Sequence, residues 1–193
     1  MWLQNKEEQI ILGSGSPRRQ ELLQQMGLHF IVDKSQNEEV PNSSIPSQVV
    51  MELAEQKALE VAGRHTDGSL VIGADTIVAL DDRILGKPAD EVEAFEMLHA
   101  LQGRTHQVYT GVCLVRRNGE EIQQELFYEC TNVHVIEMSD EEIRAYIATK
   151  DPMDKAGAYG IQGLFAPFIS GIEGDYYNVV GLPISSLYRH LFR

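Results

Sequence analysis

Hydrophobic and polar residues follow two patterns along the chain, one typical of buried strands and one typical of amphipathic helices. The apolar run at 9–13 predicts a buried strand, and Ser16 as N-cap with Pro17 at the first helical position predicts a helix that ends at Gly27. A polar stretch at 34–47 predicts a loop. Apolar residues at three- and four-residue spacing then predict a helix over 49–63.

The middle of the chain predicts more strands than helices. The runs SLVIGAD and TIVAL indicate a buried strand pair or one bent strand, and 90–103 predicts a helix that Gly103 stops. Two long strands are expected at 106–117 and 121–138, joined by a hairpin at Asn118-Gly119 and therefore antiparallel.

The last third of the chain returns to mixed elements. Ser139 and Glu142 have the spacing of a capping box at the start of a helix over 139–150, and a glycine-rich loop follows at 151–163. The segments FAPFISGI and YYNVVG predict strands, and a final helix is expected from Pro183. Helices mixed with strands, crossovers and a hairpin predict an α/β fold around a mixed sheet.

The length and polarity of the chain limit its organisation. With 193 residues and no internal repeat, we expect a single domain over 1–193, which can bury one good core or two small lobes. No run approaches the roughly 20 apolar residues of a membrane span, and the first residues are charged where a signal peptide is hydrophobic. We therefore expect a cytoplasmic protein without membrane association.

A net charge of -13 argues against a nucleic acid polymer as partner, because phosphate contacts along a polymer need a clustered basic face. The basic residues nevertheless gather in the Gly-, Pro- and Ser-marked motifs: Arg18, Arg19, Lys57, Lys87, Arg104 and Lys155. An acidic protein with a local basic pocket suits a small polyanion. Cys113 and Cys130 are predicted to be buried thiols, and the six histidines show no metal-ligand spacing.

The first candidate site is SGSPRR, Ser14 to Arg19, where the first strand leads into a helix. A helix N-terminus offers unpaired N–H groups and partial positive charge, and the two arginines add fork-shaped donors for phosphate oxygens. The motif is neither a Walker loop nor a dinucleotide fingerprint. By pattern alone, a capped surface helix with two solvated arginines remains an equal alternative.

The second candidate site is GADT, Gly73 to Thr76, at the end of the apolar run LVI. An aspartate that leaves a buried strand is held rigidly, as a general base or metal ligand must be, although Asp75 could equally cap a turn. Asp75 with Glu38 or Glu39 would suit magnesium, which prefers oxygen ligands and bridges phosphates. Downstream, the GKP motif places Lys87 in a loop, where lysines are usually solvated.

The third candidate site is DKAGAYGIQG, Asp154 to Gly163. Its glycines permit close approach of the backbone to a ligand, and Lys155 and Gln162 supply a charge and an amide that can pair with a donor and an acceptor. Such an amide could bind the edge of a base. An ordinary flexible loop remains the alternative.

Six motifs in order, SGSPRRQELL, LAEQKA, GADTIV, GKP, GRTHQVYTGV and PMDKAGAYGIQG, resemble the Maf family of nucleotide pyrophosphatases from about residue 10 to 185. The resemblance implies a Maf/Ham1 fold of the inosine triphosphate pyrophosphatase type, with a long mixed sheet and flanking helices around a central cleft. Departures from the family pattern are slight: Gly13 stands for a commoner alanine, and Asp151 for the usual glutamate.

By this resemblance, Asp75 corresponds to the family's proton acceptor, and Arg18, Thr76 and Gln162 to positions that set substrate choice. Other cleft positions are Ser14, Arg19, Glu39, Lys57, Lys87 and Lys155, with Glu39 the candidate metal ligand. The complete GAYGIQG points to the branch that hydrolyses dTTP and UTP to the monophosphate and pyrophosphate. The sister branch, directed at 7-methyl-GTP, differs in this loop.

The resemblance also implies a nucleoside triphosphate as partner, a divalent cation, Mg²⁺ or alternatively Mn²⁺ or Co²⁺, as cofactor, and a homodimer. Two other functions remain open at the level of sequence. One is a regulatory binding protein that affects septum formation and keeps the pocket without turnover. The other is a pyrophosphatase for deaminated purine triphosphates, against which the Gln162 loop argues.

Overall fold

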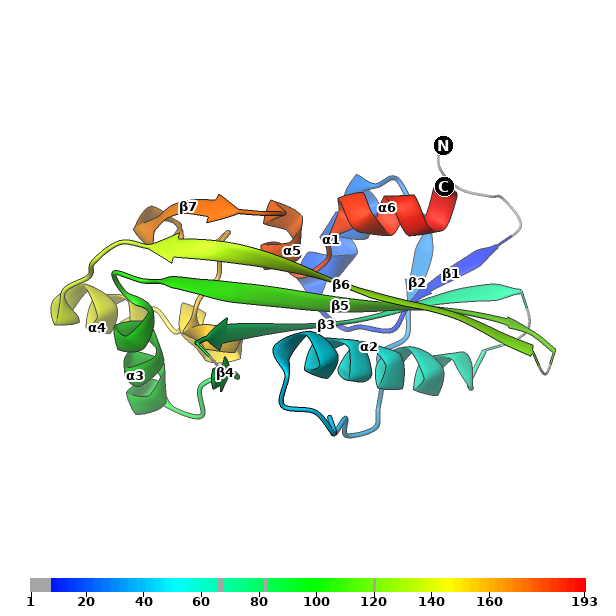
Figure 1. The fold of residues 1–193 in the computed structure, drawn as a ribbon, viewed down its shortest axis with the longest axis horizontal. Coiled ribbons are helices and arrows are strands. Elements are labelled where there is room, and N and C mark those ends of the chain that lie inside the picture. The colour runs from blue at the N-terminus through cyan, green and yellow to red at the C-terminus, as the bar shows by residue number, and fades with distance from the viewer. Residues whose placement is uncertain (1–7, 66–67, 82, 120) are drawn as a thin grey trace. The chain divides into compact units, whose positions relative to one another are not determined.

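The computed structural model describes residues 8–65, 68–81, 83–119 and 121–193, which form a mixed sheet with flanking helices (Figure 1). The strands are β1 (Gln9–Leu12), β2 (Phe30–Val32), β3 (Ser69–Leu80), β4 (Arg83–Leu85), β5 (Thr105–Asn118), β6 (Glu121–Val135) and β7 (Ile169–Glu173). The α-helices are α1 (Pro17–Gln25), α2 (Pro46–Ala62), α3 (Glu91–Leu101), α4 (Asp140–Ala148), α5 (Tyr176–Val180) and α6 (Ile184–Phe192). Short 3-10 turns occupy Asp151–Asp154, Ala156–Ala158 and Ala166–Phe168.

The strand order in the sheet is β2-β1-β3-β5-β6-β7, with β4 paired to β3. β1 pairs in parallel with both β2 and β3, while β3–β4 and β6–β7 are antiparallel. The predicted α/β class with a mixed sheet is therefore confirmed. Within the described residues, no helix combines the length and the apolar character that a membrane crossing needs.

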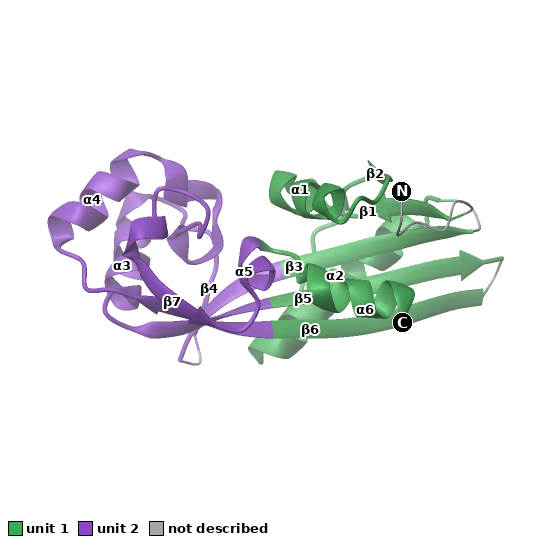
Figure 2. Cartoon of the chain, turned by 90° about the horizontal axis from the view of Figure 1, so that it is seen from above, with its two compact units in different colours: residues 1–75, 110–129, 181–193 green, residues 76–109, 130–180 purple. Residues whose placement is uncertain are grey.

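The chain divides into two compact units (Figure 2). Unit 1 comprises 1–75, 110–129 and 181–193, and unit 2 comprises 76–109 and 130–180, so that β3, β5 and β6 contribute residues to both. Each unit has its own buried apolar cluster, one around Ile11, Val71 and Val115 and the other around Leu98 and Phe165. The predicted single domain with a central cleft stays a prediction.

In unit 1, α2 packs on the sheet at glycine positions. A Cβ atom at Gly73 of β3 would lie 2.4 Å from the carbonyl oxygen of Ala54 and 2.8 Å from the Cβ of Ala58. A Cβ at Gly111 of β5 would lie 2.3 Å from the carbonyl oxygen of Val50. Because neither strand carries a side chain at these points, the helix backbone reaches the sheet directly, which explains the small residues in LAEQKA.

Several sequence predictions about local structure were wrong. The segment YYNVVG is mostly the helix α5, because Asp175 accepts a hydrogen bond from the N–H of Tyr177 at 2.8 Å and the buried Asn178 donates to the carbonyl of Val108 at 2.9 Å. These contacts override the strand propensity of the segment. Cys113 is buried as predicted, but Cys130 is exposed. The run SLVIGADTIVAL forms one strand, so the single-strand alternative is confirmed. The strands β2 and β4 were missed, because three residues show no periodicity.

Candidate active site

The SGSPRR motif joins β1 to α1 in unit 1, with Pro17 at the first helical position as predicted. The Ser16 hydroxyl does not cap the helix. Arg19 is buried, and its guanidinium donates to the Ser14 hydroxyl at 2.9 Å and to the Gly181 carbonyl at 2.8 Å. Arg18 on the same turn is only half-buried. The motif thus contains a buried arginine that braces the turn and a more accessible neighbour.

The guanidinium of Arg19 interacts electrostatically with two other charged groups, Asp75 and Arg18. Burial lowers the pKa of its guanidinium, Asp75 opposes this effect and Arg18 adds to it. The positive charge of Arg19 is therefore held in a poorly solvated place within the electrostatic range of a carboxylate. This arrangement is typical of sites that bind anions, where a partly desolvated cation interacts strongly with phosphate oxygens.

Asp75, Lys57 and Glu39 meet in unit 1. The Lys57 ammonium donates a hydrogen bond to Asp75, and it lies 3.8 Å from a carboxylate oxygen of Glu39. The three side chains are 17–23% exposed, so they are enclosed but reachable by a ligand. Glu38, which the sequence left open as an alternative to Glu39, is exposed.

The two carboxylates of this cluster are suited to a divalent cation that also binds a substrate. The Glu39 and Asp75 carboxylates reach the same ammonium, so both can approach one cation. Mg²⁺ is commonly held by one or two carboxylates together with waters and substrate phosphates. Among the described residues, no group of three or more His, Cys, Asp or Glu could hold a metal.

Four predicted site residues belong to unit 2. Thr76 directly follows Asp75 along β3 and is half-buried, whereas Lys87 and Gln162 are exposed. The Lys155 ammonium donates to both carboxylates of its own loop, at 3.1 Å to Asp151 and 2.7 Å to Asp154. Lys155 therefore stabilises the glycine-rich loop through two ion pairs, a role that the sequence did not predict.

The glycine-rich loop is anchored to the body of unit 2. The Gly157 N–H donates to the Gly86 carbonyl at 3.0 Å, and Gly157 has a φ of 66° with Val78 too close to admit a Cβ. The Tyr159 hydroxyl and the Nε2 of the buried His106 lie 2.7 Å apart. The GRTHQ and GAYG motifs are therefore joined by one buried hydrogen bond.

His106 should make the protein sensitive to mild acid. Burial, with a smaller contribution from His134, lowers the pKa of His106 to about 4 from an ordinary 6.5. Protonation therefore favours the unfolded chain, and we expect about 3 kcal/mol of unfolding free energy to be lost as the pH falls from 6.5 towards 4. Urea titrations of the wild type and His106→Gln across this range measure the effect. Equal losses in both proteins would contradict it.

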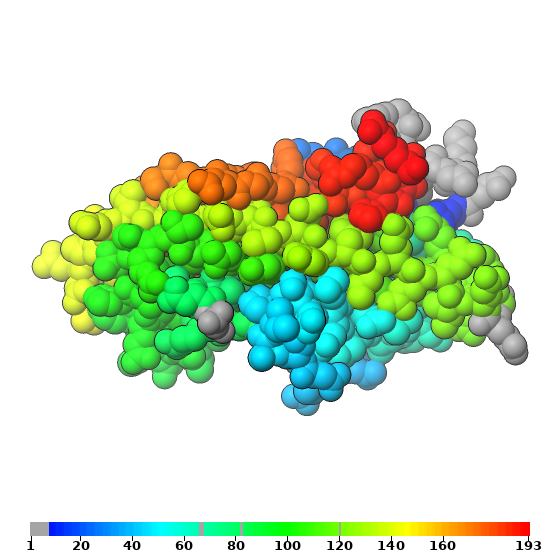
Figure 3. All heavy atoms as spheres, in the orientation of Figure 1, coloured from blue at the N-terminus to red at the C-terminus, as the bar shows by residue number. Residues whose placement is uncertain are grey.

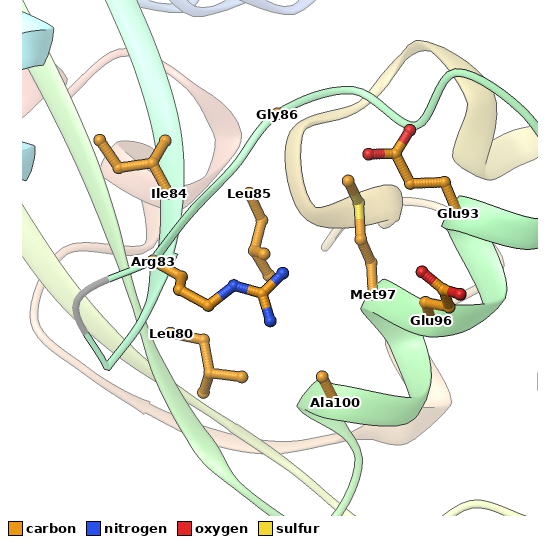
Figure 4. Close-up of a pocket in the computed structure, with 9 residues that line it drawn as sticks. All are labelled: Leu80, Arg83, Ile84, Leu85, Gly86, Glu93, Glu96, Met97 and Ala100. Atoms are coloured by element: carbon orange, nitrogen blue, oxygen red, sulfur yellow. The ribbon is translucent and has the colours of Figure 1, made fainter.

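A hollow of about 190 Å³ lies elsewhere in unit 2, between β4 and α3 (Figure 4). The guanidinium of Arg83 and the side chain of Met97 point into it, and the carboxylates of Glu93 and Glu96 lie along its α3 side. It contains no predicted site residue. Two carboxylates against one guanidinium would repel a triphosphate, so this hollow does not suit a nucleotide.

Comparison with known proteins identifies the family. A family model described as Maf-like protein matches residues 9–193. The chain belongs to the Maf family. Among relatives of this Maf chain, the dTTP/UTP pyrophosphatase of Lachnoclostridium phytofermentans is 48% identical over 95% of this chain and 93% of the relative. The dTTP/UTP pyrophosphatase of Bacillus cereus is 54% identical over 94% of this chain and 93% of the relative.

A solved structure of a dITP/XTP pyrophosphatase from Mycobacterium abscessus is 15% identical to the Maf chain, with a TM-score of 0.47 over 95% of both chains.

In each unit, side chains that the motifs did not reveal support a predicted site residue. Gln56 and Glu52 bind the backbone of the loop that carries Glu39 in unit 1, and Asp151 accepts a hydrogen bond from Lys155 in unit 2. Gln56 is part of LAEQKA and Asp151 stands next to the PMDK motif, but nothing in the spacing shows which backbone a side chain will bind. Their roles depend on contacts between segments far apart in the sequence.

Proposed function

We propose that the chain hydrolyses dTTP and UTP to the nucleoside monophosphate and pyrophosphate. The observation that carries the proposal is the Lys57–Asp75–Glu39 cluster, set in the same unit as the buried Arg19 of SGSPRR. It combines a candidate base, a place for a divalent cation and donors for phosphate. Relatives about half identical over nearly the whole chain carry the name dTTP/UTP pyrophosphatase, which supports this substrate choice.

In the proposed reaction, Asp75 orients a water molecule and accepts its proton as the water oxygen attacks the α-phosphorus. The bond from the α-phosphorus to the bridging oxygen breaks, and pyrophosphate leaves. Arg18 and Arg19 stabilise the charge on the phosphates, and Lys57 fixes the orientation of Asp75. A magnesium ion at Glu39 and Asp75 would neutralise further phosphate charge when bound.

The substrate preference is proposed to depend on Gln162, which is exposed in the glycine-rich loop, with Thr76 and Arg18. Uracil and thymine present two carbonyl acceptors and an N–H donor, and a carboxamide can pair with one of each. Replacing Gln162→Glu exchanges a donor for a charged acceptor. We expect kcat/KM for dTTP and UTP to fall at least about tenfold, or about 1.4 kcal/mol.

This prediction is checked by the ratio of kcat/KM for dTTP to that for GTP. Gln123→Glu, which changes another exposed glutamine, is the matched control and should leave the ratio unchanged. An unchanged ratio in Gln162→Glu would remove the amide from base recognition.

A nucleotide panel tests the function itself. Pyrophosphate release is measured for dTTP, UTP, dITP, XTP and 7-methyl-GTP, with Mg²⁺ and with a chelator. We expect release from dTTP and UTP that the chelator abolishes. Preference for dITP or XTP would indicate a purine-directed enzyme, preference for 7-methyl-GTP the sister branch, and binding without release a regulatory protein. A cytoplasmic location and a homodimer remain part of the proposal.

A further inference from the structure

The loop between β2 and α2, residues 33–45, carries Glu39 and is held by side chains of α2. The side-chain oxygen of Gln56 accepts from the Val40 N–H at 3.1 Å, and its Nε2 donates to the Val40 carbonyl at 2.9 Å. Both polar groups of one carboxamide thus pair with both backbone groups of one residue. Among side chains of this length, only glutamine can supply the donor and the acceptor together.

A second contact lies one helical turn earlier. Glu52 accepts from the Asn42 N–H at 2.6 Å and from the Ser43 N–H at 3.3 Å. Positions four apart share one face of a helix, so Glu52 and Gln56 form a row that binds the loop backbone at successive points. Atoms of α2 and of the loop lie on the surface in Figure 3, where such contacts must compete with water.

The Val40 contact matters because of its neighbours. Glu39 directly precedes Val40, and Lys57, the cation that contacts Glu39 and Asp75, directly follows Gln56. Two successive residues of α2 therefore contact this part of the loop: Gln56 binds the Val40 backbone, and Lys57 lies near the Glu39 carboxylate. The two hydrogen bonds to Val40 restrain the backbone next to Glu39, so the Glu39 carboxylate has less conformational freedom to lose when it binds a cation.

We propose that Gln56 is a positioning residue that fixes the loop backbone at Val40 and so presents the Glu39 carboxylate, together with Asp75, to a divalent cation. The inference rests on the proposed function for the role of that cation. Groups that orient a metal ligand commonly change metal affinity by about 10- to 100-fold. Ordering the loop in advance removes an entropy cost that binding would otherwise bear.

The test compares Gln56→Leu with the wild type. Two measurements need no turnover: hydrogen exchange of the Val40 amide by NMR, without metal or nucleotide, and Mn²⁺ affinity by EPR. Loss of both hydrogen bonds should speed Val40 exchange about tenfold or more and weaken Mn²⁺ binding about tenfold. At saturating Mg²⁺, kcat should stay within about threefold, because the reacting groups remain. Gln56→Glu keeps the acceptor for the Val40 N–H but loses the donor to the Val40 carbonyl. Its Val40 exchange rate should therefore lie between those of the wild type and Gln56→Leu.

Gln48→Leu is the matched control. Gln48 is an exposed glutamine of the same helix, and its side-chain oxygen accepts from the Ser43 hydroxyl at 2.7 Å, away from Val40. Unchanged Val40 exchange or Mn²⁺ affinity in Gln56→Leu, or equal changes in Gln48→Leu, would overturn the proposal. A chain that shows the Gln56 effects but hydrolyses no nucleotide would refute the proposed function and leave the positioning role intact.

Discussion

Asp75→Asn should abolish nucleotide hydrolysis in a protein that still folds. The carboxylate lies on β3 in contact with Lys57, and asparagine keeps the size and a hydrogen-bond acceptor for the ammonium while losing the ability to take a proton. Loss of a general base lowers kcat by about 10²- to 10⁴-fold, and by more if a metal site is lost with it. Steady-state kinetics with dTTP measures kcat, and circular dichroism checks the fold.

Asp81→Asn is a suitable control for this change. Asp81 directly follows β3, is exposed and contacts the Arg104 guanidinium with both oxygens at 3.0 Å. Its φ of 53° is tolerated by asparagine. We expect activity within about twofold of the wild type, since a surface change of this kind is worth about 0.5 kcal/mol or less. Wild-type kcat in folded Asp75→Asn would remove this carboxylate from the mechanism.

Gly73→Ala should destabilise unit 1 and impair activity together. The new methyl group would lie 2.4 Å from the Ala54 carbonyl oxygen, and because that neighbour is backbone, α2 must shift. Overpacking costs about 1–3 kcal/mol, which corresponds to a fall in Tm of about 2–12 °C for a chain of this size. Since α2 carries Lys57 and β3 carries Asp75, kcat/KM should fall about tenfold or more through misplacement of these groups.

Gly63→Ala isolates the effect of the close approach. Gly63 ends α2 with a φ of -63°, and a Cβ there would meet the Glu60 carbonyl oxygen at 3.4 Å, an ordinary contact. Alanine should leave Tm unchanged or raise it slightly, because it restricts the unfolded chain. Differential scanning calorimetry and dTTP kinetics on both variants make the comparison. If Gly73→Ala has the same Tm and kcat/KM as Gly63→Ala, the packing of α2 on β3 does not require a glycine at position 73.

The sequence predicted elements best where local signals were strong. The strand, Ser16-Pro17 start and helix of SGSPRR, and the Ser139–Glu142 capping box of α4, occur where expected. The failures occurred where tertiary contacts decide the structure. α5 has the β-branched and aromatic residues of a strand, but Asn178 is buried and bound to the Val108 carbonyl and the Thr131 hydroxyl.

In the candidate site, too, local motifs predicted individual residues, whereas tertiary contacts decided which of them meet. Motifs identified Asp75, Lys57 and Glu39 as separate positions, and chemistry suggested a carboxylate pair for magnesium. Their meeting at one ammonium depends on the packing of α2 against Gly73, which no local pattern reveals. For the same reason, no motif singled out Gln56. Its role is visible only once the loop backbone at Val40 is placed beside it.

The position of an oxygen label tests the central claim most directly. The wild-type protein is incubated with dTTP and Mg²⁺ in H₂¹⁸O, and the products are separated and analysed by mass spectrometry. Attack by water on the α-phosphorus places the label in dTMP and releases unlabelled pyrophosphate. Label in pyrophosphate, or formation of dTDP and orthophosphate, would place the attack at another phosphorus and contradict the proposed reaction.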